Sequence, residues 1–383
     1  MRLYFDWNST TPPIPAARAA AEAAWASAWG NPASVHAEGR AARALLEESR
    51  RVVAELCGAR PDGVVWTSGG TEASNLALSS PFEDGKGALV LAPLEHASVT
   101  ACAEQLERRG VKVRHAHVTR EGHVDVDSVA RRLGEGDVRL VAIQAVNGET
   151  GVVQPFAEIA ALAHARGAVV HVDAVQGVGR IPPPAGGWVG VADTVALAAH
   201  KIGGLRGIGA LVLRPGHPLR PLLRGGSQER GLRPGTQDAA LTAAFAAAAR
   251  VAFDSVATYE AVRPLRDRFE SALAGLGAWV NGAAPRVAHV VHVSFPSWSS
   301  PELVAALDLD GLACSGGAAC HAGVTEPSST LKAMFGEPAD AGRLLGPIRF
   351  SLPPHTTGAD VDRAVEIVRK VLARQHRLTP LTS

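Results

Sequence analysis

The sequence is poor in several features that would each mark a class of protein. It has four cysteines, Cys57, Cys102, Cys314 and Cys320, too few for the disulfide framework of a small secreted protein. Its formal net charge at pH 7 is +1, so charge does not predict nucleic-acid binding. No run approaches the roughly 18 consecutive apolar residues of a membrane span, and the first residues lack a signal peptide's apolar core. We therefore expect a cytoplasmic protein that binds neither nucleic acid nor membrane.

Short apolar runs alternate with amphipathic stretches through the first half of the chain. The predicted strand at residues 64–67 is followed by a predicted helix at 71–79, and the strand at 138–145 by a helix at 156–166. This alternation predicts an α/β fold with a mostly parallel central sheet and helices on both faces. Ligands of such sheets bind beyond the carboxyl ends of the strands.

With 383 residues, the chain is too long for one small core, so we predict two domains. The last hundred or so residues combine predicted strands and helices in an α+β pattern. We assign residues 13–250 to a large domain. Residues 251–383, together with 1–12, form a smaller C-terminal domain that would carry Cys320.

Lys201 lies between two apolar runs that we predict to be strands, one ending just before His200 and one at residues 208–213. Gly203 and Gly204 follow it and permit tight turns and close approach of a ligand. Burial at a strand end lowers the pKa of a lysine, and a neutral amine can form a Schiff base with an aldehyde. Taken alone, Lys201 is better explained as a strand-end lysine whose amine reaches water.

Two further features indicate a cofactor site. Residues 67–72, Thr-Ser-Gly-Gly-Thr-Glu, follow a predicted strand and open a helix, where backbone N–H groups and the helix dipole favour an anion such as phosphate. Asp173 ends another buried strand and needs a cationic partner there, for which a protonated pyridine nitrogen is suitable. The alternatives are a capped tight turn and a turn-capping carboxylate. Together with Lys201, these features match the requirements of pyridoxal 5'-phosphate (PLP).

Over nearly its whole length the chain resembles the cysteine desulfurases of the class V aminotransferase family, which are PLP-dependent enzymes of fold type I. The matching stretches are residues 5–12, 30–34, 67–72, 95–96, 171–176, 200–201, 225–236, 315–320 and 348–352. The resemblance implies that PLP-dependent removal of sulfur from L-cysteine gives L-alanine and a persulfide on Cys320. It also implies a homodimer, and an acceptor such as an iron–sulfur scaffold or another protein that uses the sulfur for cofactor biosynthesis.

The resemblance assigns roles around the cofactor. Lys201 would hold PLP covalently and move protons, Asp173 would pair with the pyridine nitrogen, and His96 would stack on the ring and assist proton transfer. Gln176 would hydrogen-bond the phenolic oxygen. The phosphate would be held by four residues, the last of them supplied by a second subunit: Gly70, Thr71, His200 and Thr236.

The resemblance also assigns the substrate site. Cys320 lies in a loop rich in glycine and alanine, where an exposed thiolate could attack the substrate sulfur, although an inert buried cysteine is the common alternative. Arg349 would bind the substrate carboxylate with help from Asn8, and a structural salt bridge is the alternative for Arg349. We expect no metal, because His115 and His117 share a strand face without an evident third ligand.

Two positions depart from the family pattern. Gly148 replaces an asparagine that contacts the phenolic oxygen, and Ala198 replaces a serine that often binds the phosphate. Losing one neutral hydrogen bond costs about 0.5–1.5 kcal/mol, so we expect weakened but retained PLP binding. Two alternatives stay open. One is another class V reaction, that of a selenocysteine lyase or an aminotransferase, and the other is a weakly active sulfur-carrier or assembly relative.

Overall fold

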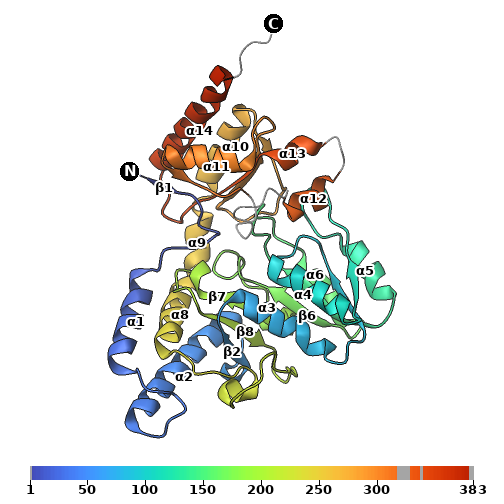
Figure 1. The fold of residues 1–383 in the computed structure, drawn as a ribbon, viewed down its shortest axis with the longest axis vertical. Coiled ribbons are helices and arrows are strands. Elements are labelled where there is room, and N and C mark those ends of the chain that lie inside the picture. Colours follow the sequence, from blue (N-terminus) through green and yellow to red (C-terminus); the bar gives the residue numbers. More distant parts are fainter. Residues whose placement is uncertain (1, 317–327, 337–339, 379–383) are drawn as a thin grey trace.

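A seven-stranded sheet forms the centre of the larger, lower part of the computed structural model, which describes residues 2–316, 328–336 and 340–378 (Figure 1). The strand order is β2-β8-β7-β6-β5-β3-β4. The strands are β2 Val64–Thr67, β3 Ala88–Leu91, β4 Lys112–His115, β5 Val138–Gln144, β6 Val169–Asp173, β7 Thr194–Ala198 and β8 Gly209–Leu213. Six of these strands run in the same direction, and β8 alone runs in the opposite direction. The predicted α/β fold with a mostly parallel sheet is therefore confirmed.

Helices cover both faces of this sheet. Side chains alternate along each strand, so that in β5 Val141 and Ile143 join one core cluster while Leu140 and Ala142 join another. The first cluster is covered by α2 Ala37–Cys57, α5 Val126–Gly134, α6 Phe156–His164, α7 Trp188–Val191 and α8 Ala239–Ala252. The second is covered by α3 Gly70–Ser79 and α4 Ala97–Arg108. With both faces buried, polar ligand-binding groups can gather at the ends of the strands.

A second, smaller core contains residues from near the start of the chain and from its last described helix (top of Figure 1). Leu3 and Phe5 pack in it, next to an antiparallel sheet of order β12-β10-β9. We propose that this core is the smaller predicted domain, although α12 packs against the large core. The elements within the predicted domain are β1 Leu3–Tyr4, α10 Arg263–Gly275, β9 Trp279–Val280, β10 Val290–Ser294, α11 Ser300–Leu309, β11 Leu312–Ala313, α12 Ser329–Phe335, α13 Ala341–Leu345, β12 Pro347–Ser351 and α14 Gly358–Leu378.

Residues 255–275 form two helices in the structure, α9 (Ser255–Glu260) and α10 (Arg263–Gly275). Pro264 lies in the first turn of α10, a position that proline favours because it cannot donate a backbone hydrogen bond. Within the described residues no single helix has the length and apolarity of a membrane span, and α8 with residues Ser255–Gly275 meets that test only as a pair bent by 61°.

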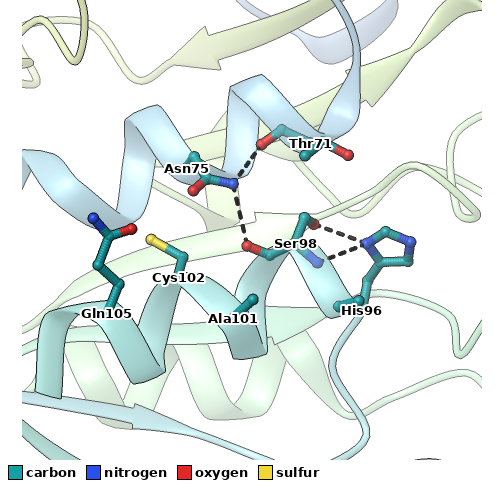
Figure 2. A pocket seen from close by; sticks show the side chains of 8 residues that line it. Thr71, Asn75, His96, Ser98, Ala101, Cys102 and Gln105 are labelled. Carbon is teal, nitrogen blue, oxygen red and sulfur yellow. Dashed lines mark hydrogen bonds between the residues drawn. The ribbon is translucent and has the colours of Figure 1, made fainter. Parts of the chain in front are cut away.

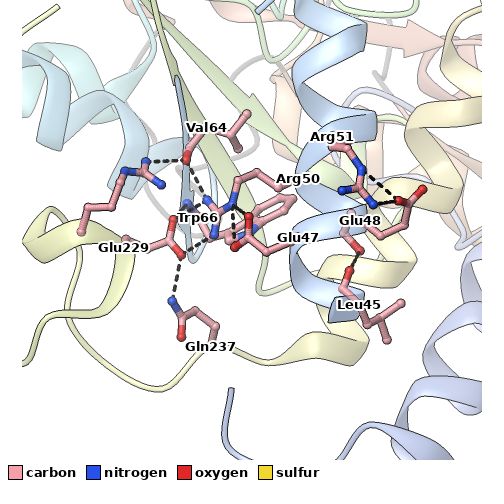
Figure 3. Close-up of polar contacts among 11 residues, drawn as sticks. Leu45, Glu47, Glu48, Arg50, Arg51, Val64, Trp66, Glu229 and Gln237 are labelled. Carbon is pink, nitrogen blue, oxygen red and sulfur yellow. Dashed lines mark hydrogen bonds and ion pairs between the residues drawn. The ribbon is translucent and has the colours of Figure 1, made fainter. Parts of the chain in front are cut away.

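A buried ion pair fixes the segment after β8 to helix α2 (Figure 3). Arg50 Nη1 and Nη2 donate to the two carboxylate oxygens of Glu229, each at 2.8 Å. Burial raises the pKa of Glu229, but Arg50 and the N–H groups of Trp66 and Gln237 outweigh burial and hold this pKa below its ordinary value. Glu229 also has a φ of 47°, in the left-handed region that non-glycine residues avoid. The ion pair therefore stabilises a strained segment that leads to Thr236.

Removing this carboxylate should destabilise the fold strongly. Glu229→Ala removes the buried partner of Arg50 and leaves only the half-exposed Glu47 beside its Nε, which should lower the free energy of unfolding by about 3–5 kcal/mol. Urea unfolding measures the change. The control is Glu48→Ala, which breaks two exposed pairs, one with Arg51 on the same helix and one with Arg250 on α8, and should change stability little. Similar losses in the two variants would contradict a structural role for the buried pair.

Candidate functional site

Most of the predicted cofactor-binding residues lie at the carboxyl ends of the central strands of the large sheet. β6 ends at Asp173, β7 ends at Ala198, and Lys201 closes the short 3-10 helix η3 (Ala199–Lys201) that follows β7. Asp173 pairs in register with Ala196 of β7, and Lys201 is near enough to favour the charged form of the Asp173 carboxyl. The site thus lies at the carboxyl ends of the strands, where open α/β sheets bind ligands.

The turn between β2 and α3 is packed against these strand ends. No side chain caps the start of α3 at Gly69, so the first N–H groups of the helix can serve an external anion. A Cβ at Gly70 would lie 2.8 Å from Val175 Cγ2 and 3.7 Å from the Cβ of Ala198. Only glycine lets the helix start come this close, which puts Gly70 and Thr71 beside the turn after Asp173.

Asp173 and Glu95 form a buried pair of carboxyl groups. Asp173 accepts the backbone N–H of Val175 at 3.0 Å, whereas Oε2 of Glu95 has no hydrogen-bond partner among the described residues. Burial raises the pKa of both groups, and at Glu95 the nearby charge of Asp173 adds to the rise. At Asp173, His96, the Val175 N–H and Lys201 oppose the rise. These shifts favour the protonated form of Glu95 and leave Asp173 as the member of the pair on which negative charge is favoured.

A pH titration of stability can test the protonation of Glu95. The pKa of Glu95 is higher in the folded state than in the unfolded state, where it is about 4.3. The wild-type protein therefore loses stability as the pH rises above about 4.3, because the unfolded chain releases this proton more readily. Glu95→Gln cannot ionise, so its stability relative to wild type should increase between about pH 5 and pH 8. Urea unfolding at both pH values measures this, with the exposed Glu55→Gln as control. A difference that is independent of pH would show that Glu95 is not protonated in the fold.

Lys201 and Gln176 both contact the segment before α1 (Pro15–Ser27). Lys201 Nζ donates to the backbone oxygens of Asn8 at 2.6 Å and Ser9 at 2.8 Å, and Gln176 Nε2 donates to that of Asn8 at 3.0 Å. The Oε1 atom of Gln176 is buried and has no hydrogen-bond partner among the described residues. Buried amide groups are normally satisfied, so this atom indicates a ligand-binding position beside Lys201.

Arg180 belongs to the site, although the sequence analysis did not identify it. Its guanidinium is 1% exposed, lies over the ring of Tyr259, and donates to Asn8 Oδ1 at 2.9 Å and to the backbone oxygen of Lys201 at 3.0 Å. It thereby fixes the backbone that carries Lys201. No motif distinguishes this arginine in the sequence, because its partners are distant in the chain.

His200 is neutral in this environment. Burial lowers its pKa to about 4, and the positive charges of Lys201 and Arg180 add to this effect. Its Nδ1 lies 3.1 Å from the hydroxyl of Thr10. Near neutral pH, His200 can therefore take part in a phosphate site through hydrogen bonding rather than through charge.

His96 begins helix α4 and lines an open cavity (Figure 2). Its Nδ1 accepts the backbone N–H of Ser98 at 3.1 Å, so His96 caps the start of α4. The other ring nitrogen, Nε2, can therefore carry the proton. Asn75 on α3 donates to the backbone oxygens of Thr71 and Ser98 and so joins the two helix starts. The cavity has a volume of about 360 Å³. The predicted stacking role of His96 remains a prediction.

Arg349 lies in β12 with 3% of its surface exposed. It forms the salt bridge that was the alternative to substrate binding, with Asp6 at 2.7 Å, and it also donates to the backbone oxygen of Gly148 at 3.1 Å. Asn8 Nδ2 donates to the same oxygen at 3.1 Å. The structure thus brings Arg349, Asn8 and Gly148 together, and the predicted role of the first two in binding substrate stays a prediction.

The remaining predicted residues are less closely tied to this centre. Cys320 lies outside the described residues. Ser315, five residues before it, exchanges two backbone hydrogen bonds with Arg349: its N–H donates to the Arg349 oxygen at 3.1 Å, and its oxygen accepts from the Arg349 N–H at 2.7 Å. Burial raises the pKa of the Cys314 thiol, consistent with a packing role. Thr236 is exposed on its own chain. Within the described ranges, no cluster of three or more histidine, cysteine or acidic residues is arranged to hold a metal.

Comparison with known proteins identifies the family. A sequence model described as Aminotransferase class-V matches residues 3–364. The chain belongs to the class-V aminotransferase family. It is 38% identical to a cysteine desulfurase of Cereibacter sphaeroides, over 99% of this chain and 98% of that protein. It is 37% identical to an IscS-like cysteine desulfurase of Mycobacterium tuberculosis, over 98% of this chain and 97% of that protein.

The fold of this class-V aminotransferase is also that of known structures. A solved NifS-like protein superposes with a TM-score of 0.89 at 30% identity, covering 98% of this chain and all of the other. A NifS-like protein from Rickettsia africae superposes with a TM-score of 0.87 at 26% identity, covering 97% and 100%. The resemblance inferred from the sequence motifs is confirmed.

Proposed function

We propose that this protein is a PLP-dependent cysteine desulfurase, which takes sulfur from L-cysteine, releases L-alanine and leaves a persulfide on Cys320. The proposal is carried by the convergence of Lys201, Asp173 and the start of α3 at the carboxyl ends of the strands, beside Gln176 Oε1, which has no hydrogen-bond partner among the described residues. Full-length relatives named cysteine desulfurase support it.

The donor set fits PLP, whose pyridinium ring supplies an electron sink when the cofactor is bound. Asp173, on which the negative charge of the buried pair is favoured, would keep the pyridine nitrogen protonated. The phosphate would be held by the first N–H groups of α3, the hydroxyl of Thr71 and neutral His200. Lys201 would leave the backbone oxygens that it contacts, hold the cofactor covalently and then carry protons at Nζ.

Arg349 would bind the carboxylate of cysteine, because a guanidinium offers two parallel N–H bonds to a carboxylate. The thiolate of Cys320 would accept the substrate sulfur. Ser315 is five residues before Cys320 and is bonded to Arg349, which supports delivery of the thiol to the same site.

The proposal includes a homodimer. Thr236 is exposed, and the segment that carries it is anchored by the pairs Arg50–Glu229 and Arg233–Glu72. A rigid, exposed hydroxyl suits a contact with the phosphate bound by a second subunit. The persulfide would pass to an acceptor protein for iron–sulfur cluster or other sulfur-cofactor biosynthesis.

The proposal can be tested by supplying PLP and L-cysteine. Alanine should accumulate, and intact mass should rise by one sulfur at Cys320. Cys320→Ser should keep the cofactor's absorbance but lose sulfide release, because the thiol acceptor is missing. Cys314→Ser, a matched change six residues earlier, should keep release. Undiminished release by Cys320→Ser would reject Cys320 as acceptor, and absence of alanine from the wild type would reject the function.

Restoring the asparagine at position 148 should tighten cofactor binding. A Cβ at Gly148 would lie 3.7 Å from Gln176 Cγ and Nε2, an ordinary contact distance. The added amide can reach toward the cofactor's phenolic oxygen, so Gly148→Asn should lower the dissociation constant of PLP by about 2- to 12-fold. Titration of the apoprotein, followed by absorbance, measures this. Gly148→Ala adds only the Cβ and should give no gain, and an equal gain from alanine would refute the hydrogen bond.

A further inference from the structure

Three of the predicted ligand-binding side chains donate to the same short segment, the N-terminal turn Asp6–Ser9. Lys201 Nζ donates to two of its backbone oxygens at 2.6 and 2.8 Å, and Gln176 Nε2 donates to one of these at 3.0 Å. Arg349 Nη2 donates to the carboxylate of Asp6 at 2.7 Å. The N-terminal turn therefore satisfies donors that the proposed function assigns to PLP and cysteine.

The donors of Arg349 can be counted. The two hydrogens of Nη2 are given to Asp6 Oδ1 and to Ser9 Oγ, each at 2.7 Å, while Nη1 donates to the backbone oxygen of Gly148. Nε is buried and has no partner within the described part of the chain. Both guanidinium edges that can hold a carboxylate through two parallel N–H bonds include Nη2. A ligand carboxylate can therefore bind in this manner only if Asp6 or Ser9 leaves.

Asp6 is the group that a second carboxylate would displace. It carries the same charge as the ligand, and two carboxylates on one guanidinium repel each other, whereas the hydroxyl of Ser9 is neutral. The side chain of Asp6 is 20% exposed and that of Arg349 is 4% exposed. Once released, the Asp6 carboxylate can be rehydrated, while Arg349 stays buried and needs an anion.

We propose that Asp6 sets the affinity of the site for carboxylate ligands, because its carboxylate occupies Arg349 in the free protein and is exchanged for that of the substrate. This inference rests on the proposed function, in which Arg349 binds the carboxylate of cysteine. The exchange conserves one ion pair. Binding energy gained at Arg349 is therefore reduced by the loss of the Asp6 pair, and a ligand without a carboxylate gains nothing from removing Asp6.

The test uses equilibrium binding of L-alanine, the proposed product, to the PLP-loaded protein, followed by the change in cofactor absorbance. Asp6→Asn removes the competing charge and should tighten L-alanine binding by about tenfold, the equivalent of one charge-assisted hydrogen bond. L-alaninamide lacks the carboxylate and should bind no more tightly to the variant than to wild type. Glu38→Gln, an equal charge change at an exposed position of α2, should leave both affinities unchanged.

Asp6→Ser provides a second variant in case the asparagine variant does not fold, and urea unfolding verifies the fold of each. Weaker or unchanged L-alanine binding in a folded variant would overturn the proposal, because Asp6 would then orient Arg349 rather than compete for it. Arg349→Ala tests the premise separately. If this variant keeps L-alanine binding, the assigned substrate site is wrong, and if wild type makes no alanine from cysteine, the proposed function is wrong.

Discussion

The burial of Asp173 is the physical constraint on which the site depends. A carboxylate that is 8% exposed at the end of a central strand must be compensated by positive charge or hydrogen bonds. Burial and the charge of Asp173 favour the protonated form of Glu95, while His96 and Lys201 favour the charged form of Asp173. In the proposed function the cofactor's pyridinium completes this compensation. The same arrangement that is costly in the free protein thus becomes a source of cofactor affinity.

The site is assembled from both cores of the molecule. Phe5 packs in the smaller core, and one residue later Asp6 meets Arg349, while Asn8 contacts Lys201 and Arg180 at the large sheet. The N-terminal turn therefore lies between the two cores and contacts the groups assigned to cofactor and substrate. Because these contacts are hydrogen bonds and an ion pair rather than apolar packing, ligands can replace them without unfolding either core.

Local patterns in the sequence predict the elements of the fold closely. The strand at 64–67 has the predicted bounds, and the helix predicted at 71–79 is α3, Gly70–Ser79, because turn residues mark these positions. Long-range polar contacts leave no such local signal. Asp6 and Arg349 are 343 residues apart, and Arg180 and Asn8 are 172 apart, so the occupied state of Arg349 and the role of Arg180 required the structure. The protonation of Glu95 likewise depends on burial, which the Glu-His motif does not reveal.

The central claim is that PLP is covalently held by Lys201, and one measurement tests it most directly. The protein is loaded with PLP, reduced with borohydride to fix any covalent adduct, digested, and analysed by peptide mass spectrometry. We expect a reduced pyridoxyl phosphate group on the peptide that contains Lys201, and we expect no other peptide to be modified stoichiometrically. An unmodified Lys201 peptide after loading and reduction, or the adduct on a different lysine, would contradict it.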